Sequence, residues 1–170
     1  MKPDIAHRQG ASISSAKTLV VGLISDTHGL LRPEAVEALR GSDFIVHAGD
    51  IGAAEILDEL TLLAPVTAIR GNSDGNWAWH LPDFAVLQVG EVRLFIIHSA
   101  ADADSDYANA GYDAVISGHT HLPESAHEDG VLFVNPGSAG PYRPNTPVAV
   151  GRLHIQGKTI TTQSIELDAI

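Results

Sequence analysis

The chain has 170 residues, of which 44% are hydrophobic and 18% are charged, as is typical of a globular domain with a real core. Its 21 acidic residues outnumber its 10 basic residues and give a formal net charge of −11. This balance argues against general binding to nucleic acids or anionic membranes, because phosphate contacts need Lys and Arg. The sequence contains no Cys, so disulfides, thiolate metal sites and Cys nucleophiles are excluded.

The first 17 residues differ from the rest of the chain. They carry scattered charges and no apolar run of signal-peptide length. We expect residues 1–17 to form a disordered extension or an expression remnant, and residues 18–170 to form one domain. No segment approaches the roughly 20 apolar residues of a membrane span. We therefore expect a cytoplasmic protein that does not enter a membrane.

The first half of the domain alternates between strands and helices. Apolar runs predict strands over residues 19–25, 44–48 and 65–69. A Pro start and apolar spacing predict a helix over residues 33–39, and an apolar stripe predicts a second over residues 53–63. Strands that alternate with helices at this spacing indicate βαβ units and a parallel sheet.

The second half is rich in predicted strands, with one short helix expected over residues 105–110. Its strands are expected at residues 84–89, 91–98, 114–117, 123–128, 131–135, 148–155 and 159–167. The dipeptide Asp129-Gly130 is a strong hairpin signal between two of them. The whole pattern predicts an α/β protein in which two sheets pack face to face with helices on the outside.

Five of the predicted strands end on side chains that can bind a metal. These are Asp26 and His28, then Asp50, Asn72, His98, and finally His119 with His121. Ligand sites of α/β sheets open at the carboxyl ends of strands, so these side chains are expected to meet. Imidazole, carboxylate and amide ligands suit Mn²⁺, Fe, Zn²⁺, Ni²⁺ or Co²⁺ far better than Ca²⁺. The sequence therefore predicts a metal centre.

The ordered set of motifs resembles the calcineurin-like metallophosphoesterases, in particular the small single-domain YfcE-type branch. The motifs are Asp26-x-His28, Gly49-Asp50, Gly71-Asn72-x-Asp74, His98 and Gly118-His119-x-His121, and the resemblance extends to Asn135-Pro136-Gly137-Ser138 and Arg143. The resemblance runs from about residue 18 to the C-terminus. It implies a four-layer αββα sandwich of two mixed β-sheets with flanking helices, and a dinuclear metal centre.

The resemblance also implies a role for each motif residue. Asp26, His28 and His121 would bind one metal ion, Asn72, His98 and His119 a second, and Asp50 would bridge both. Two divalent ions are expected, Mn²⁺ first, with Ni²⁺, Fe, Zn²⁺ or Co²⁺ as alternatives. The implied reaction is hydrolysis of a small phosphodiester by a metal-bridging hydroxide.

Within this implied reaction, Asp50, Asn72 and His98 are the expected catalytic residues. Asn72 and Arg143 are expected to contact the substrate, although a structural ion pair for Arg143 is equally compatible with the sequence.

The chain departs from the wider family beside the motif Asn. Many members have a His there that protonates the leaving group, but this chain has Ser73, as the YfcE-type branch also often lacks that His. Loss of a positioned general acid typically costs about 10²–10⁴-fold in rate, so phosphodiesters with good leaving groups are favoured. Asp74 is expected to orient the loop, and His80 is a weaker candidate for the acid. Ser99 stands where a Gly commonly follows the ligand His.

Several other side chains have two readings. His47 lies on a buried strand and is expected to support the site or the core rather than to bind metal. Trp77 and Trp79 could wall a substrate pocket or pack a lid. His127 and His154 are expected at the surface.

Two classes of function are compatible with this sequence. The favoured one is a dinuclear metal-dependent phosphodiesterase. The alternative is a non-catalytic protein-binding scaffold of the same fold, like the retromer subunit Vps29, although a retired site usually shows eroded ligands and all seven positions here carry competent side chains. A homodimer is left open.

Overall fold

The computed structural model describes residues 17–103 and 106–168. The extension expected over residues 1–17 therefore lies, apart from Lys17, outside the described residues. Within the described ranges, no helix has the length and apolar character that a membrane crossing needs.

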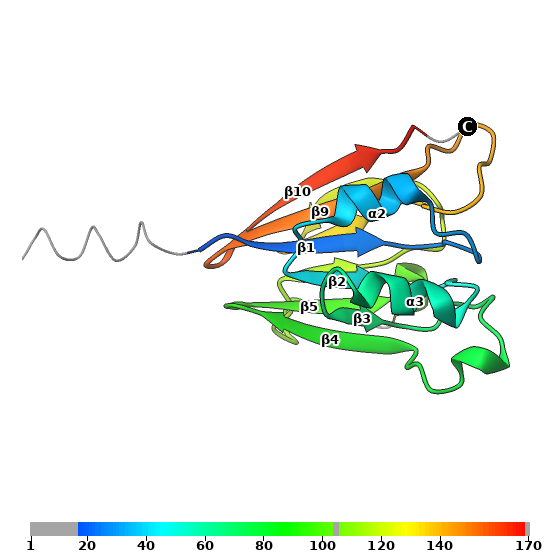
Figure 1. Ribbon diagram of the computed structural model, residues 1–170. Helices are drawn as coiled ribbons and strands as arrows, with labels where there is room; N and C mark the ends of the chain where they lie inside the picture. The colour runs from blue at the N-terminus through cyan, green and yellow to red at the C-terminus, as the bar shows by residue number, and fades with distance from the viewer. Residues whose placement is uncertain (1–16, 104–105, 169–170) are drawn as a thin grey trace, which may run out of the picture.

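Among the described residues, ten strands form two five-stranded sheets (Figure 1). The first sheet has the order β10-β9-β1-β2-β3 and the second the order β4-β5-β6-β8-β7. The strands of the first sheet are β1 (Leu19–Ile24), β2 (Phe44–His47), β3 (Val66–Ala68), β9 (Ala149–Gln156) and β10 (Thr159–Glu166). Those of the second are β4 (Phe84–Val89), β5 (Val92–Ile97), β6 (Ala114–Ile116), β7 (Glu124–Glu128) and β8 (Val131–Asn135).

Both sheets are mixed, as expected. In the first sheet β1, β2 and β3 are parallel, while β9 pairs antiparallel with β1 and with β10. In the second sheet β5, β6 and β8 are parallel, and β4 and β7 run antiparallel at the edges. The parallel strands of each sheet therefore bring their carboxyl ends to a common edge.

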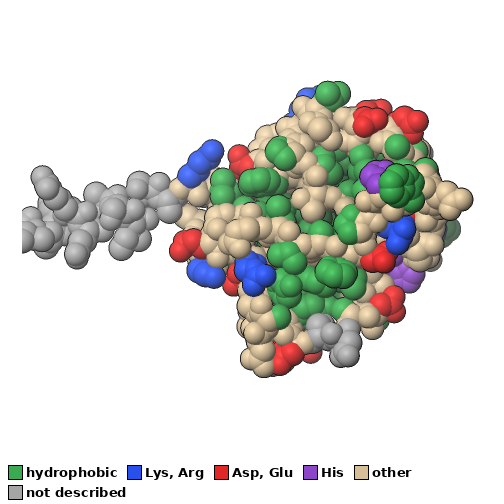
Figure 2. Space-filling view, turned by 90° about the horizontal axis from the view of Figure 1, so that it is seen from below, with side chains coloured by type: hydrophobic (Ala, Val, Ile, Leu, Met, Phe, Trp, Pro, Cys, Tyr) green, Lys and Arg blue, Asp and Glu red, His purple; other side chains and the backbone are tan. Residues whose placement is uncertain are grey.

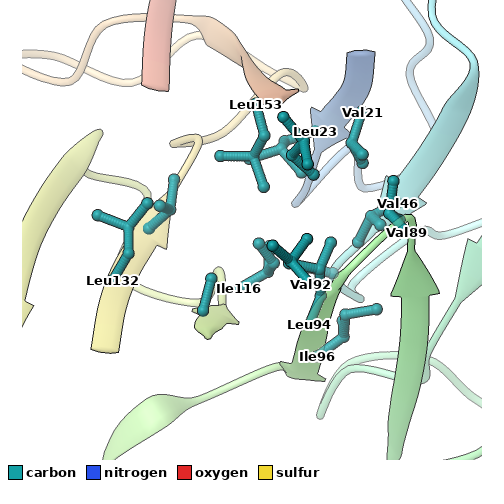
Figure 3. Packing of buried hydrophobic residues seen from close by; sticks show 14 of the residues in the cluster. Val21, Leu23, Val46, Val89, Val92, Leu94, Ile96, Ile116, Leu132 and Leu153 are labelled. Carbon is teal, nitrogen blue, oxygen red and sulfur yellow. The ribbon is translucent and has the colours of Figure 1, made fainter. Parts of the chain in front are cut away.

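The main core lies between the two sheets, where alternate residues of facing strands interdigitate (Figure 3). Leu23 and Leu153 come from the first sheet, and Leu94, Ile96 and Ile116 come from the second; all five are fully buried. This close packing fixes the position of one sheet, and hence of the loops that follow its strands, relative to the other.

In the part of the chain that the structure describes, two α-helices, α2 (Pro33–Leu39) and α3 (Ala54–Thr61), cover the outer face of the first sheet (Figure 1). Pro33 starts α2 where its missing N–H has no cost. Leu39 of α2 and Leu60 of α3 pack with Ile24 and Ile45 of the sheet. Both helices were expected from the sequence, and α2 has the predicted bounds.

The outer face of the second sheet has a different cover, and the helix predicted over residues 105–110 is wrong in its described part. A single turn, closed by the Ala110 N–H on the Asp106 carbonyl at 3.0 Å, stands there, preceded by the 3₁₀ helix η2 (Ala100–Asp102). Gly111, with φ of 83°, ends the turn before a second one can form. Tyr107 anchors it to the sheet through Phe95, with ring centroids 5.3 Å apart.

The hairpin between β7 and β8 turns at Asp129-Gly130, as predicted. Both residues have positive φ, 51° and 80°, which is the geometry that favours this dipeptide in a two-residue hairpin.

On the side seen from below in Figure 1, hydrophobic side chains gather along the molecule, and the visible His side chains lie at one end (Figure 2). In β4, the hydrophobic side chains of Phe84 and Val86 are exposed.

Candidate metal centre

The loops that follow β1, β2, β3, β5 and β6 bring all seven predicted ligands to one place. Six of them form two groups, and within each group the ligand atoms lie within 4.8 Å of one another. The first group is Asp26, His28 and His121, and the second is Asp50, His98 and His119. Asn72 joins the second group, because its Oδ1 lies 3.1 Å from His119 Nδ1. The resemblance assigned Asp50 to both ions, and the structure places its carboxylate with the second group.

Backbone hydrogen bonds tie these loops to one another. The Asp26 N–H donates to the Gly49 carbonyl at 3.0 Å, and the His28 N–H donates to the Asp50 carbonyl at 2.9 Å. In the second sheet, the Gly118 N–H donates to the His98 carbonyl at 2.9 Å. Each ligand loop is thus held by its neighbour, so the side chains are preorganised rather than free to move apart.

The backbone at the site is strained in a way that the sequence does not reveal. Five predicted ligands have the left-handed conformation that non-Gly residues rarely adopt, with φ between 46° and 71°: Asp26, His28, Asp50, His119 and His121. Among the described residues, two other non-Gly residues share this conformation, Asp129 and Asn145. Such strain costs about 1–3 kcal/mol per residue and concentrates at functional sites. Strain that gathers at five predicted ligands makes these loops the candidate functional site.

Two glycines permit the close approach of the loops. A Cβ on Gly71 would fall on Asp50 Oδ1 and on the Asp50 backbone nitrogen, and a Cβ on Gly118 would fall on Ser25 Oγ with Asp26 Oδ2 at 2.6 Å. Any side chain at either position would displace a carboxylate of the site. This explains why a Gly stands directly before Asn72 and His119.

Asp26 is fully buried and presents one oxygen to the centre. Its Oδ2 accepts hydrogen bonds from Ser25 Oγ at 2.6 Å and from the His119 N–H at 3.0 Å. Its Oδ1 has no hydrogen-bond partner among the described residues and lies 3.2 Å from His121 Nε2 and 3.9 Å from His98 Nε2. Sequence reasoning missed Ser25, since a Ser at the end of an apolar strand carries no distinctive signal.

His98 is held in the tautomer that a metal ligand needs. Its Nδ1–H donates to the Ala48 carbonyl at 2.7 Å, which leaves Nε2 to face the site. That Nε2 is buried, has no hydrogen-bond partner in the described chain and lies 3.2 Å from Asp50 Oδ2. Burial works against protonation, but the nearby Asp50 carboxylate and the hydrogen bond to the Ala48 carbonyl prevail and raise the pKa of His98.

Asp50 lies between the two groups. Its Oδ2 is 3.2 Å from His98 Nε2 in the second group and 3.8 Å from His28 Nε2 in the first, while its Oδ1 accepts the Ser73 N–H at 2.9 Å. Burial favours the neutral acid, but the adjacent His98 imidazole and the hydrogen bond from Ser73 outweigh it and hold the pKa of Asp50 below its ordinary value. Asp50 is therefore a carboxylate at neutral pH.

His121 and His28 complete the first group, with their Nε2 atoms 3.3 Å apart. Burial, the positive charge of Arg143 and the nearby His28 lower the pKa of His121, against the opposing effect of Asp26. A neutral imidazole is the form that binds a metal. Arg143 is exposed beside this group and makes no ion pair with any described carboxylate, so the structural ion pair that the sequence left open does not form here.

His47 forms hydrogen bonds with two of the ligand loops and belongs to neither ligand group. Its Nδ1 accepts the Gly49 N–H at 3.2 Å, so its Nε2–H donates to Thr27 Oγ1 at 2.9 Å. The Thr27 hydroxyl in turn donates to the Ile51 carbonyl at 2.8 Å. Burial first, and then the nearby His98, lower the pKa of His47 to about 3. The supporting role expected for this residue matches these contacts.

The residues beside the motif Asn behave as the sequence suggests. Asp74 accepts the N–H groups of Ile51, Gly52 and Gly71 at 2.9–3.2 Å and so fixes the loop. His80 is exposed, and it is not among the described residues that line the cavity beside the second group. His127 is exposed as expected, and His154 is half-buried against Gln163, outside the site.

The donor set fits two divalent transition-metal ions. Its atoms are imidazole nitrogens, carboxylate oxygens and one amide oxygen, which suit such ions. Buried, unpartnered Asp26 Oδ1 and His98 Nε2 lie 3.9 Å apart and face each other across the centre. Buried polar atoms of this kind are costly without a partner, and a cation between them would satisfy both.

Comparison with known proteins agrees with this geometry. Residues 19–158 match the calcineurin-like phosphoesterase superfamily domain. The chain is 34% identical over 163 residues to a probable metallophosphoesterase of Methanothermobacter thermautotrophicus, an alignment that covers 89% of this chain and 94% of that protein.

Solved structures share the fold. A structure described as a novel archaeal phosphodiesterase superposes with a TM-score of 0.73 at 27% identity, over 88% of this chain and 100% of the other. Vacuolar protein sorting 29 of Cryptosporidium parvum superposes with a TM-score of 0.71 at 20% identity, over 89% of this chain and 99% of the other. The second likeness concerns the fold alone.

Proposed function

Because this chain belongs to the calcineurin-like phosphoesterase superfamily, we propose that it is a dinuclear metal-dependent phosphodiesterase. The observation that carries the proposal is the pair of buried, unpartnered ligand atoms, Asp26 Oδ1 and His98 Nε2, that face each other between the two ligand groups. A structural role alone would leave these atoms without a partner at a substantial cost.

The proposed ligand sets follow the two groups. Asp26, His28 and His121 hold one ion, His98, His119 and Asn72 hold the other, and Asp50 serves both. When bound, two divalent ions, with Mn²⁺ as our first expectation, supply a water of lowered pKa as nucleophile and stabilise charge on the phosphoryl oxygens.

The chain's own residues orient the substrate. Asn72 is exposed at the site and presents its amide to a phosphoryl oxygen. Arg143, exposed beside His121 and unpaired with any described carboxylate, offers its guanidinium to another. Ser73 donates its N–H to Asp50 and carries no imidazole, so leaving groups that depart without a strong acid are favoured.

The first test measures metal content and hydrolysis together. Purified protein loaded with Mn²⁺ is expected to bind close to two ions per chain and to hydrolyse bis-p-nitrophenyl phosphate faster than p-nitrophenyl phosphate. The measurements are elemental analysis by mass spectrometry and release of p-nitrophenol. Absence of bound metal together with absence of turnover after reconstitution would overturn the proposal.

The second test is the substitution Asp50→Asn. It removes the carboxylate that lies between the two groups, so we expect turnover to fall by more than about 100-fold, beyond the 10–100-fold that loss of an outer hydrogen-bond partner of a ligand costs. Asp58→Asn, the same chemical change on the exposed face of α3, is the matched control and should leave turnover unchanged. Equal rates for the two variants would show that Asp50 does not serve the centre.

The likeness to Vps29 keeps a protein-binding scaffold as the second candidate. The strained backbone at five of the seven ligands favours the enzyme, since a scaffold has no need of that strain at those positions. Two bound ions with no hydrolysis of any phosphodiester in a panel of nucleotide and alkyl esters would favour the scaffold.

A further inference from the structure

A cavity of about 530 Å³ opens beside the second ligand group. Asn72, His98 and His119 line it together with other residues of the segment that follows β3; the first group is not among the described lining residues. Its volume is within the range of about 300–1,000 Å³ that small-molecule sites occupy. One of the two ester arms of a bound phosphodiester would therefore enter this cavity, while Arg143 lies on the side of the first group.

The two tryptophans near this cavity have different roles. Trp77 is half-buried and packs with the hydrophobic cluster beneath α2 and α3. Trp79 is 78% exposed and lines the cavity, with an edge contact to His80 at 5.7 Å between ring centroids. An indole that keeps most of its surface in water beside a reactive centre offers a flat face to a ligand.

The loop that carries Trp79 is closed at its base. The Arg70 N–H donates to the Pro82 carbonyl at 2.8 Å, and the Arg70 guanidinium binds Asp83 Oδ1 through Nη2 at 2.7 Å. Between these ends, the 3₁₀ helix η1 (Asn76–Ala78) buries Ala78 completely, directly before Trp79. The indole is thus presented on a fixed loop, which lowers the entropic cost of stacking a ligand on it.

The charges in the cavity are mainly acidic. Its described lining includes one cation, Arg70, which already binds Asp83, and two further carboxylates, Asp74 and Asp102. Asp74 is held by three backbone N–H groups, but Asp102 has no described cation beside it. Outside the second ligand group, the described lining thus offers no cation free of an ion pair, so it fits a neutral ligand arm.

We propose that this cavity binds the neutral, aromatic ester arm of a phosphodiester, of the nucleoside type, with its ring stacked on Trp79. The inference rests on the proposed phosphodiesterase function and names its substrate class. Stacking of a base on an aromatic side chain accounts for roughly 5- to 100-fold in affinity.

The test compares two ligands that differ in the presence of the adenine base. Adenosine 5′-monophosphate and ribose 5-phosphate are titrated by calorimetry into the Mn²⁺-loaded protein. We expect the monophosphate to bind about 5- to 100-fold more tightly than ribose 5-phosphate. Trp79→Ala should remove this difference, and Trp79→Phe should keep most of it.

Fluorescence gives a second readout that does not depend on turnover. Adenosine 5′-monophosphate should quench the emission of Trp79, so quenching is expected in Trp77→Phe and lost in Trp79→Phe. Equal affinity for the monophosphate and ribose 5-phosphate, or unchanged quenching in Trp79→Phe, would overturn the inference even if the protein hydrolyses phosphodiesters. Stacking without hydrolysis would support the aromatic subsite and overturn the phosphodiesterase.

Discussion

His47 makes the folded protein sensitive to acid, and the substitution His47→Gln should reduce that sensitivity. The side chain is fully buried, and its Nδ1 accepts the Gly49 N–H, so the ring is neutral in the folded state. Burial, with His98 nearby, lowers the pKa of His47 from 6.5 to about 3. A second proton would have to displace the Gly49 hydrogen bond.

The magnitude follows from the two pKa values. Below pH 6.5 the unfolded chain binds a proton at His47 that the folded chain does not bind until about pH 3. The stability that the neutral ring supports is therefore fully present above pH 6.5 and is lost as the pH falls. The slope is about 1.4 kcal/mol per pH unit, so roughly 2–3 kcal/mol is lost between pH 6.5 and 4.5. For a chain of this length, this corresponds to a fall in Tm of about 5–10 °C.

The assay is urea unfolding in the presence of EDTA, followed by circular dichroism at pH 4.5, 5.5, 6.5 and 7.5. At pH 7.5, His47→Gln should lower the free energy of unfolding by about 1–3 kcal/mol, because the Gly49 N–H loses its acceptor. Below pH 6.5, the free energy of unfolding of the variant should also fall less steeply with decreasing pH. Its slope should be smaller than that of the parent by about 1.4 kcal/mol per pH unit. His127→Gln, at an exposed position, is the matched control and should retain the parent slope.

The comparison refutes the reasoning if the parent and His47→Gln lose stability in parallel between pH 6.5 and 4.5. Parallel curves would mean that His47 is already protonated in the folded state, or that the folded state opens around it. A loss of slope in His127→Gln as well would assign the acid sensitivity to surface charge instead.

Three further outcomes are expected. His98→Ala should lower bound Mn²⁺ from two ions towards one per chain by elemental analysis, and two retained ions would contradict the second ligand set. Gly71→Ala should weaken Mn²⁺ binding at least about tenfold in calorimetry, because its Cβ would fall on Asp50. A Cβ at Gly75 meets no atom within 4 Å, so the control variant Gly75→Ala should bind Mn²⁺ like the parent. Mn²⁺ at about 100 times its Kd should stabilise the protein by about 2.7 kcal/mol, or roughly 5–10 °C in Tm by calorimetry, and EDTA should reverse this; an unchanged Tm would mean that the ion does not bind the folded chain preferentially.

Local pattern was sufficient for most elements of this fold. The bounds of α2, β4 and β8 are those predicted, because Pro starts, turn dipeptides and apolar runs act over a few residues. The prediction failed over residues 105–110. There the left-handed Gly111 and the burial of Tyr107 against the second sheet limit the backbone to one turn.

The chemistry of the candidate site was also readable from the chain. Strand ends that each deliver a carboxylate, amide or imidazole meet at one edge of a parallel sheet, so order along the sequence predicts proximity in space. The family resemblance assigned Asp26, His28 and His121 to one ion, Asn72, His98 and His119 to a second, and Asp50 to both. In the structure, Asp50 groups with His98 and His119, and Asn72 lies beside His119.

The sequence by itself determined the element types, the candidate ligands and the absence of thiol chemistry, since these depend on residue identity and short spacings. Tertiary structure alone decided that β9 and β10 extend the first sheet beside β1, that five ligands adopt the left-handed backbone, and that Trp79 rather than Trp77 faces the cavity. These features depend on contacts between segments far apart in the chain. Strain at a loop persists only because the packed sheets and neighbouring loops overdetermine its conformation, and no local pattern encodes that.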